Sequence, residues 1–226
     1  MGSMMRYQGL FITFEGPEGS GKTTQIRRLG QWLKKKGIPC LLTREPGGSR
    51  LSTHLRRWIL NRLEYHLVPE TELFLFLADR SQHVKEILVP ALKKGKVVLC
   101  DRYTDSTLAY QGGGRGFDLE LLQTLNQAAT EGLQPDLTVL FDVPVEVGLK
   151  RAAARRGKKD RMEREALLFH RKVRKVFLRL SRRFPGRFLV LDAGKSPEQV
   201  FQALTKGLQN RLPGVWKKKL ERGFRG

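Results

Sequence analysis

Residues 10–23 read Leu10-Phe11-Ile12-Thr13-Phe14-Glu15 and then Gly16-Pro17-Glu18-Gly19-Ser20-Gly21-Lys22-Thr23, an apolar run that passes into a glycine-rich loop. The run is typical of a buried strand, and residues 23–36 have helical spacing, so the loop joins a strand to a helix. It matches G-x-x-x-x-G-K-[ST] at every position. Glycines let successive N–H groups point inward, and the next helix directs its positive end to the same place. The loop is therefore predicted to bind phosphate.

Three residues extend this prediction toward a nucleoside triphosphate with its metal. Lys22 is expected to reach the β- and γ-phosphates of ATP, and the Thr23 hydroxyl to ligate Mg²⁺. Asp101 ends another apolar run, where a carboxylate can lie near that metal. Taken alone, an aspartate there is equally typical of a loop cap. The residues expected to bind ATP are Gly16, Pro17, Glu18, Gly19, Ser20, Gly21, Lys22, Thr23 and Thr24.

The rest of the chain repeats the alternation of apolar runs and helices. Near-continuous apolar runs indicate strands that are covered on both faces, as in parallel sheets. We therefore expect a three-layer α/β/α fold with a five-stranded parallel sheet, whose ligands bind beyond the carboxyl ends of the strands. The expected strands are Leu10–Glu15, Ile38–Leu42, Lys96–Cys100, Leu137–Val143 and Phe188–Leu191. The expected helices are residues 23–36, 51–60, 70–92, 119–129, 145–155, 164–180 and 197–208.

Length and composition favour one globular domain. The chain has 226 residues, 40% of them hydrophobic, and no run of 18 apolar residues, so we expect no membrane span. Cys40 and Cys100 lack metal-ligand spacing and are typical of buried, reduced thiols in a cytoplasmic protein. We expect a single domain over 1–226, with residues 1–4 a cloning remnant and 213–226 a basic tail.

The net charge of +21 is concentrated in two segments. Residues 151–187 hold 15 Lys or Arg against 3 Asp or Glu, and residues 216–226 hold 5 against 1. Such segments raise the alternative of an ATPase stimulated by nucleic acid. They contain no interleaved aromatic pattern and no known nucleic-acid module, so the sequence argues against nucleic acid as a partner.

Three charged residues are candidates for a second substrate. Glu18 would repel phosphate, so it either faces another ligand, such as a hydroxyl, or lies in solvent. Arg44 and Arg102 follow strand ends, where a guanidinium can bind a phosphate with two parallel hydrogen bonds. A structural ion pair is the alternative for each arginine.

Phe76 and Arg80 are candidates for binding a base. They lie four residues apart in an expected helix and hence on one face, where a ring could stack on a base and a guanidinium bond its edge. In isolation, a phenylalanine within Leu73-Phe74-Leu75-Phe76-Leu77 is more typical of the core.

Together these residues resemble the thymidylate kinase family, whose members phosphorylate dTMP to dTDP. The resemblance extends from Tyr7 to Leu208. Its most specific motifs are Thr43-Arg44-Glu45-Pro46-Gly47-Gly48, Asp101-Arg102-Tyr103 and Ser106-Thr107-Leu108-Ala109-Tyr110-Gln111-Gly112-Gly113. It also includes Phe14–Thr23, Phe76-Leu77-Ala78-Asp79-Arg80 and Pro135-Asp136-Leu137-Thr138. The resemblance implies a P-loop NTPase fold, Mg²⁺ with ATP as phosphoryl donor, and a homodimer to which the helix at 73–77 contributes.

The resemblance also implies roles for residues around the acceptor. Glu18 corresponds to the carboxylate that contacts the 3′-hydroxyl of dTMP, and Tyr110 to the tyrosine against C2′ of the sugar. Arg44 and Arg102 correspond to arginines at the acceptor phosphate, with Arg102 also near the transferred group.

At the base, Phe76 corresponds to the ring stacked on thymine and Arg80 to the donor to its exocyclic oxygen. Thr107 and Gln111 align with polar residues that contact the base edge. The predicted binding of a base by Phe76 and Arg80 therefore agrees with the family's pattern.

The basic segment gains a meaning from the same resemblance. Some members carry an arginine directly after the loop carboxylate, whereas bacterial-type members supply catalytic arginines from a lid. Gly19 places this chain with the second group, and the expected lid is residues 151–161. Arg151 and Arg155 are the catalytic cations expected from the lid. The other residues expected to act in catalysis are Glu18, Lys22 and Arg102. The other basic residues of the lid are Arg156, Lys158, Lys159 and Arg161.

A deoxynucleoside kinase remains the alternative among enzymes. It would also combine a phosphate loop with an Asp-Arg motif, but its acceptor is an uncharged sugar hydroxyl. Arg44 would then have no acceptor phosphate to bind.

Overall fold

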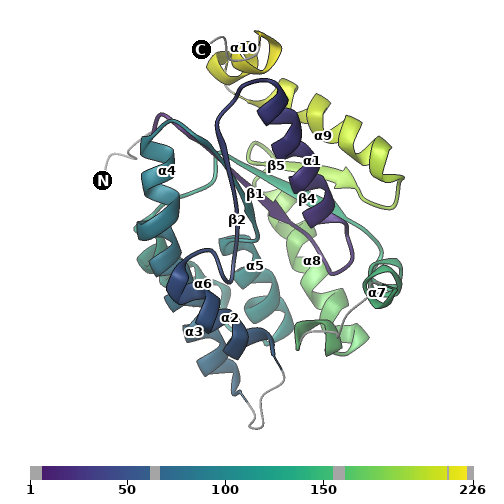
Figure 1. Cartoon of the computed structure of the whole chain (residues 1–226). Coiled ribbons are helices and arrows are strands. Elements are labelled where there is room, and N and C mark those ends of the chain that lie inside the picture. Colours follow the sequence, from purple (N-terminus) through teal and green to yellow (C-terminus); the bar gives the residue numbers. More distant parts are fainter. Residues whose placement is uncertain (1–6, 62–66, 155–160, 213, 223–226) are drawn as a thin grey trace.

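The computed structural model describes residues 7–61, 67–154, 161–212 and 214–222 (Figure 1). Its five strands are β1 (Leu10–Glu15), β2 (Cys40–Arg44), β3 (Val97–Asp101), β4 (Leu137–Asp142) and β5 (Phe188–Asp192). Its α-helices are α1 (Lys22–Lys35), α2 (Arg50–Leu60), α3 (Pro69–His83), α4 (Val89–Lys93), α5 (Thr104–Thr107), α6 (Leu119–Thr130), α7 (Val145–Ala153), α8 (Leu167–Arg183), α9 (Pro197–Arg211) and α10 (Gly214–Arg222).

The strands form one parallel sheet in the order β2-β3-β1-β4-β5, which confirms the predicted architecture. The register places Asp101 beside both Phe14 and Arg44. The loops after β1, β2 and β3 therefore start at the same edge, as expected for a ligand site beyond the carboxyl ends of the strands.

Helices cover both faces of the sheet (Figure 1). Leu10, Ile12 and Phe14 point to one face and pack with side chains of α1 and α9. Phe11 points to the other face and packs with side chains between Val84 and Leu92. This alternation within β1 gives the two apolar layers that hold the phosphate loop in place.

The predicted helix over residues 70–92 is divided in the structure. α3 ends at His83, a π-helical turn covers Val84–Leu88, and α4 continues to Lys93. Pro90 has no N–H to donate to a preceding carbonyl, and its ring needs space in the helix interior. The wider turn just before it supplies that space.

The segment after β3 is helical, which the sequence analysis did not predict. α5 continues directly into a π-helix over Leu108–Gly114. Glycine is a poor helix former, so the three glycines that end this segment obscured the helix. A Cβ on Gly113 would lie 2.7 Å from Val176, so the lack of side chains lets α8 approach closely.

The basic tail forms a helix that packs against the fold. α10 contacts α9, and Trp216 is buried in the apolar layer formed by α1, α9 and the sheet. The part of α10 around Trp216 is therefore joined to the core, although its charge had suggested no structural role.

Part of the basic stretch at 171–187 is paired with carboxylates of the same chain. Arg171 contacts Glu146, Arg174 binds Asp142 at 2.7 Å, and Arg187 binds the buried Asp105 at 2.6 Å. These three arginines join α8 and the start of β5 to neighbouring elements. Their charge thus has a structural explanation that needs no nucleic acid.

Both cysteines are free thiols, but their burial differs from the prediction. Cys100 is buried, whereas Cys40 is half-buried because β2 is an edge strand. Across the described ranges, no helix combines the length and apolar character needed to span a membrane.

Candidate functional site

A cavity of about 850 Å³ lies at the carboxyl edge of the sheet. Most of the predicted site residues line it: Glu18, Gly19, Ser20, Gly21, Lys22, Thr23, Thr24, Arg44, Phe76, Arg80, Asp101, Arg102, Thr107, Tyr110, Gln111 and Arg151. Gly16 and Pro17 lie behind this surface and contribute their carbonyl oxygens to its hydrogen bonds. Arg155 lies outside the described residues, as do Arg156, Lys158 and Lys159.

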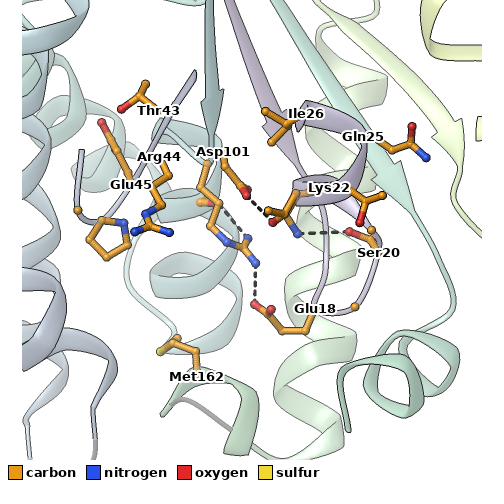
Figure 2. A pocket seen from close by; sticks show the side chains of 18 of the residues that line it. Glu18, Ser20, Lys22, Gln25, Ile26, Thr43, Arg44, Glu45, Asp101 and Met162 are labelled. Atoms are coloured by element: carbon orange, nitrogen blue, oxygen red, sulfur yellow. Dashed lines mark hydrogen bonds and ion pairs between the residues drawn. The ribbon is translucent and has the colours of Figure 1, made fainter. Parts of the chain in front are cut away.

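The phosphate loop is held together by its own lysine. Lys22 donates to the carbonyl oxygens of Gly16 and Pro17 at 2.9 and 3.0 Å. It also donates to Ser20 Oγ at 3.3 Å (Figure 2). Burial and the nearby Arg102 lower the pKa of Lys22 to about 8. The ammonium is therefore desolvated, and its interaction with a phosphate is correspondingly strong.

A glycine at position 19 is required by the approach of α7. Gly19 has φ +67°, and a Cβ there would lie 1.8 Å from the carbonyl oxygen of Gly148. An arginine could not replace this glycine without displacing α7. The geometry thus gives a physical reason why this loop carries no arginine after Glu18.

Two oxygen atoms that could hold a hard cation meet beside the loop. Thr23 Oγ1 donates to Asp101 Oδ2 at 2.9 Å. Among the described residues there is no group of three or more His, Cys, Asp or Glu that could hold a metal. A hydroxyl and one carboxylate fit Mg²⁺, which commonly takes one or two protein ligands and completes its shell with water and substrate phosphates.

Glu18 lies in a network with two of the predicted acceptor residues. Its carboxylate binds Arg102 at 2.6 Å and accepts from the Tyr110 hydroxyl at 2.7 Å. Burial alone would raise the pKa of Glu18, but Arg102, Lys22 and Tyr110 together lower it to about 2. Glu18 is therefore an ionised acceptor that faces the cavity.

Arg102 is held in one orientation by its surroundings. Besides Glu18, it donates to the Gly16 carbonyl at 3.2 Å and to Ser106 Oγ at 3.3 Å. Its guanidinium lies 4.8 Å from the centre of the Tyr110 ring. The backbone at Arg102 has φ +71°, a conformation that is uncommon for non-glycine residues.

Arg44 and Arg151, two further predicted cations of the site, differ in the hydrogen bonds that their side chains make. Arg44 is exposed, and the structure shows no hydrogen bond or ion pair for its side chain within the described ranges. Arg151 donates to the carbonyl oxygens of Ala193 and Gly194 at 2.6 and 3.0 Å. Arg44 is thus available to an anion, whereas Arg151 joins α7 to the segment after β5.

Arg161 does not act as a free cation of the expected lid. Its guanidinium donates to the carbonyl of Ile59 at 2.9 Å and forms an ion pair with the buried Glu72. This arginine attaches the start of the 3₁₀ turn Met162–Arg164 to α2 and α3. In this structure Arg161 is therefore engaged with a buried carboxylate at the end of the expected lid.

The base-binding candidates meet at the other end of the cavity. Phe76 is half-buried and lines the cavity, whereas Leu73 and Leu77 on the same helix join the core. Arg80 is buried and donates to Thr107 Oγ1 at 2.6 Å. Gln111 is buried beside them.

Several buried polar residues that support this end were missed from the sequence. Arg80 also binds Glu45 at 2.8 Å and Asn126 at 2.6 Å, and Glu45 contacts His83 at 2.9 Å. Glu72 accepts from Gln111 at 2.9 Å. The sequence feature that could have pointed to them is polar residues at helix positions that face the core. Helical spacing alone does not show which of these residues contact one another.

Glu15 is a further buried acid that the sequence analysis did not single out. It ends β1 and accepts from the Tyr103 N–H at 2.8 Å and the Ser106 hydroxyl at 2.6 Å. Burial and the nearby Asp105 raise the pKa of Glu15 to about 8. The carboxyl is therefore protonated at neutral pH, directly beneath the phosphate loop.

This raised pKa predicts a pH-dependent stability that Glu15→Gln removes. Between pH 4.5 and about 8 the folded protein keeps a proton that the unfolded chain loses, so the free energy of unfolding falls as pH rises. As pH rises through this window, we expect the free energy of unfolding of the variant to increase relative to that of the wild type. The total relative change should be on the order of a few kcal/mol. Urea unfolding at pH 5.5 and 8.5 measures the change.

Glu146→Gln is the matched control for this prediction. Glu146 is exposed, and its hydrogen bond with Arg171 lowers its pKa, so it does not titrate in this window. The interpretation of Glu15 is wrong if both variants show the same pH dependence as the wild type.

Comparison with known proteins agrees with this geometry. The family model described as thymidylate kinase matches residues 14–204. A thymidylate kinase of Carboxydothermus hydrogenoformans is 54% identical over 207 residues, covering 92% of this chain and 100% of that protein. One from Geotalea daltonii is 50% identical over 212 residues, covering 91% and 99%.

A solved structure gives the same result. The crystal structure of thymidylate kinase from Ehrlichia chaffeensis has a TM-score of 0.71 and 33% identity, covering 88% of this chain and 98% of that one. The resemblance found in the motifs is therefore confirmed over nearly the whole chain. The chain belongs to the thymidylate kinase family.

Proposed function

We propose that the protein transfers the γ-phosphoryl of ATP directly to the phosphate of dTMP within this cavity, giving dTDP and ADP. The observation that carries the proposal is a single cavity with a phosphate loop at one end and Phe76, Arg80, Thr107 and Gln111 at the other. Arg44 and Arg102 line the same cavity. Phosphoryl transfer needs such positioning and charge stabilisation more than covalent chemistry.

Lys22 and the loop amides bind the donor phosphates. Thr23 and Asp101 would hold Mg²⁺, which when bound neutralises charge on the phosphates. Lys22 must exchange its contacts with the Gly16 and Pro17 carbonyls for phosphate oxygens when ATP enters. Because the ammonium is already desolvated, this exchange gives a strong interaction.

Arg44 and Arg102 bind the acceptor phosphate. Arg44 is exposed at the end of β2, and Arg102 follows β3, the next strand of the sheet. Two guanidinium groups can neutralise the acceptor phosphate, which must approach a second anion, and each can bind it with parallel hydrogen bonds. Arg102 also lies next to the phosphate loop, close to where the transferred group must pass.

Glu18 and Tyr110 place the sugar. An ionised Glu18 can accept a hydrogen bond from the 3′-hydroxyl, and its pair with Arg102 couples that contact to the acceptor phosphate. The Tyr110 ring, buried and oriented by its hydroxyl bond to Glu18, lies against C2′ and disfavours a ribose hydroxyl. Arg151 and Arg155 are the proposed cations for the charge that develops on the transferred phosphoryl.

The test is ADP release with dTMP, thymidine and dGMP as separate acceptors, and with DNA in their absence. Rapid turnover with dTMP alone is expected. Turnover with thymidine would favour a deoxynucleoside kinase. Stimulation of ATP hydrolysis by DNA that weakens as salt rises would favour a nucleic-acid-dependent ATPase.

Phe76→Ala is expected to weaken dTMP binding with little change in kcat. Stacking of a base on an aromatic ring contributes about 1–3 kcal/mol, so KM for dTMP should rise roughly 10- to 100-fold. Phe74→Ala, an exposed phenylalanine on the same helix, is the matched control for kinetics. Steady-state kinetics in which both variants keep the wild-type KM would exclude Phe76 from the base site.

The chain is proposed to form a homodimer through α2, α3 and α6, which pack side by side. Within the expected interface helix at 73–77, Leu73 and Leu77 are buried inside the protomer, whereas Phe74 is exposed. The neighbouring helices α2 and α6 also expose Leu51, Trp58 and Leu121. Exposed apolar side chains gathered on adjacent helices are typical of an interface. The free thiols and the small nucleotide substrates favour the cytoplasm as the site of action.

Phe74→Glu is expected to yield a monomer, because it places a charge in the apolar surface of α3. Light scattering after size-exclusion chromatography gives the mass. Leu168→Glu, an equally exposed apolar position on α8, should leave the dimer intact. A wild-type monomer at micromolar concentration would contradict the assignment.

A further inference from the structure

Glu72 lies behind the base end of the cavity and makes four charge-assisted contacts. It is a fully buried residue of α3. Its Oε1 accepts from Gln111 Nε2 at 2.9 Å and from Arg115 Nε at 3.2 Å. Its Oε2 binds Arg115 at 3.0 Å and also pairs with Arg161.

The charge state of Glu72 follows from these partners. Burial acts to raise its pKa, but the hydrogen bonds from Arg115 and Gln111 outweigh it and lower the pKa below the ordinary value. An ionised carboxylate has no proton to donate. Whatever polar group Gln111 directs at Glu72 must therefore be a donor.

This constraint fixes the side-chain amide of Gln111. An amide has an NH₂ end that donates and a carbonyl end that accepts. The NH₂ end is held by Glu72, so the carbonyl end is the one left to accept from a ligand in the cavity that Gln111 lines. Without the carboxylate, the amide could turn and offer either end.

The neighbouring groups, Thr107 and Arg80, are oriented so that they offer hydrogen-bond donors rather than an acceptor. Thr107 Oγ1 accepts from Arg80 at 2.6 Å, which leaves the hydroxyl proton free to donate. The guanidinium of Arg80 is itself oriented by Glu45, Asn126 and the carbonyl of Tyr103. The base end therefore offers one acceptor, at Gln111, beside donors at Thr107 and Arg80.

We propose that Glu72 is a positioning residue that makes the site select pyrimidines carrying a proton on N3, because it holds the Gln111 amide with its carbonyl oxygen available to the base. Uracil and thymine present an N3–H donor next to the O4 acceptor. Cytosine presents an N3 acceptor next to an N4 amino donor, the reverse at both positions. The proposal rests on the proposed function, since it concerns the acceptor nucleotide of that reaction.

The experiment compares dUMP with dCMP, which differ only at this edge. In the wild type, kcat/KM for dUMP should exceed that for dCMP by at least ~100-fold, because a mismatched edge leaves buried polar groups unpaired. In Glu72→Gln this ratio should fall by ~10-fold or more, since the new amide can accept from or donate to Gln111. If Glu72 only supports the fold, both substrates lose activity equally and the proposal fails.

Glu165→Gln is the matched control. Glu165 is the other carboxylate on Arg115, at 2.6 Å, and the structure shows no contact between it and Gln111. The dUMP-to-dCMP ratio should stay at the wild-type value in this variant. A fall equal to that of Glu72→Gln would mean that selectivity follows Arg115 rather than Gln111, which overturns the proposal.

A binding measurement on the wild type keeps the proposal testable if Glu72→Gln fails to fold. Acid protonates N3 of cytosine and turns it into a donor, while the two nucleotides share the same phosphate ionisation. The ratio of Kd for dCMP to Kd for dUMP should therefore fall several-fold between pH 7.5 and pH 5. A constant or rising ratio would show that Gln111 does not offer an acceptor. Turnover of dTMP, measured alongside, tests the kinase activity separately.

Discussion

Arg102→Ala is expected to lower kcat by at least ~100-fold while the protein remains folded, because a cation aimed at developing charge supplies that much of the rate. The guanidinium is placed by Glu18 and the Tyr110 ring, which line the cavity, and by the carbonyl of Gly16 behind it. Its removal also frees Glu18 from its strongest partner. Both changes act on the acceptor phosphate and on the transferred group.

Steady-state kinetics and urea unfolding of Arg102→Ala separate catalysis from stability. Arg171→Ala removes an arginine of equal size from an exposed pair with Glu146 and should leave kcat unchanged. Arg102→Lys keeps the charge but not the parallel hydrogen bonds, so its kcat should lie between alanine and wild type. Wild-type turnover in Arg102→Ala would remove the residue from the mechanism.

Lys22→Met should lower kcat/KM for ATP by roughly 10²- to 10³-fold, because it removes the buried cation expected at the β- and γ-phosphates. Methionine keeps much of the apolar stem, so the loop loses mainly the ammonium and its bonds to the carbonyls of Gly16 and Pro17. Lys36→Met, at the other end of α1 beside Trp32, is the control. Equal effects in the two variants would contradict the assignment.

The pH dependence of the wild type provides a second measurement on Lys22. The pKa of this ammonium is lowered to about 8 in the unliganded protein. Since kcat/KM reports on the free enzyme, its value for ATP should fall as pH rises through about 8, where the charge is lost. That decline should be absent in Lys22→Met.

The fold could be predicted from the sequence because its decisive signals are local. The apolar run at residues 10–15 and the loop at 16–23 are adjacent in the chain, and five such runs alternate with helices. The helix through Leu108–Gly114 could not be predicted, because its glycines oppose helix formation and its stability comes from packing against α8. Trp216 is a similar case, since a single aromatic residue amid lysines gives no periodic pattern.

Residues of the site could be predicted where a sequence motif places them in the loop that directly follows a strand. Glu18, Lys22 and Arg102 all follow directly from that rule. Glu72 does not, because its partners Gln111 and Arg115 lie 39 and 43 residues away in the chain. The partner of Arg161 could not be predicted either, since a basic segment gives no sign that this arginine pairs with the buried Glu72.

The most direct test of the central claim is a crystal structure with dTMP and a non-hydrolysable ATP analogue. We expect the triphosphate on the loop with Lys22, the dTMP phosphate between Arg44 and Arg102, and thymine against Phe76. The γ-phosphorus should then face an oxygen of the dTMP phosphate. A dTMP phosphate bound away from both arginines, or a base away from Phe76, would contradict the account.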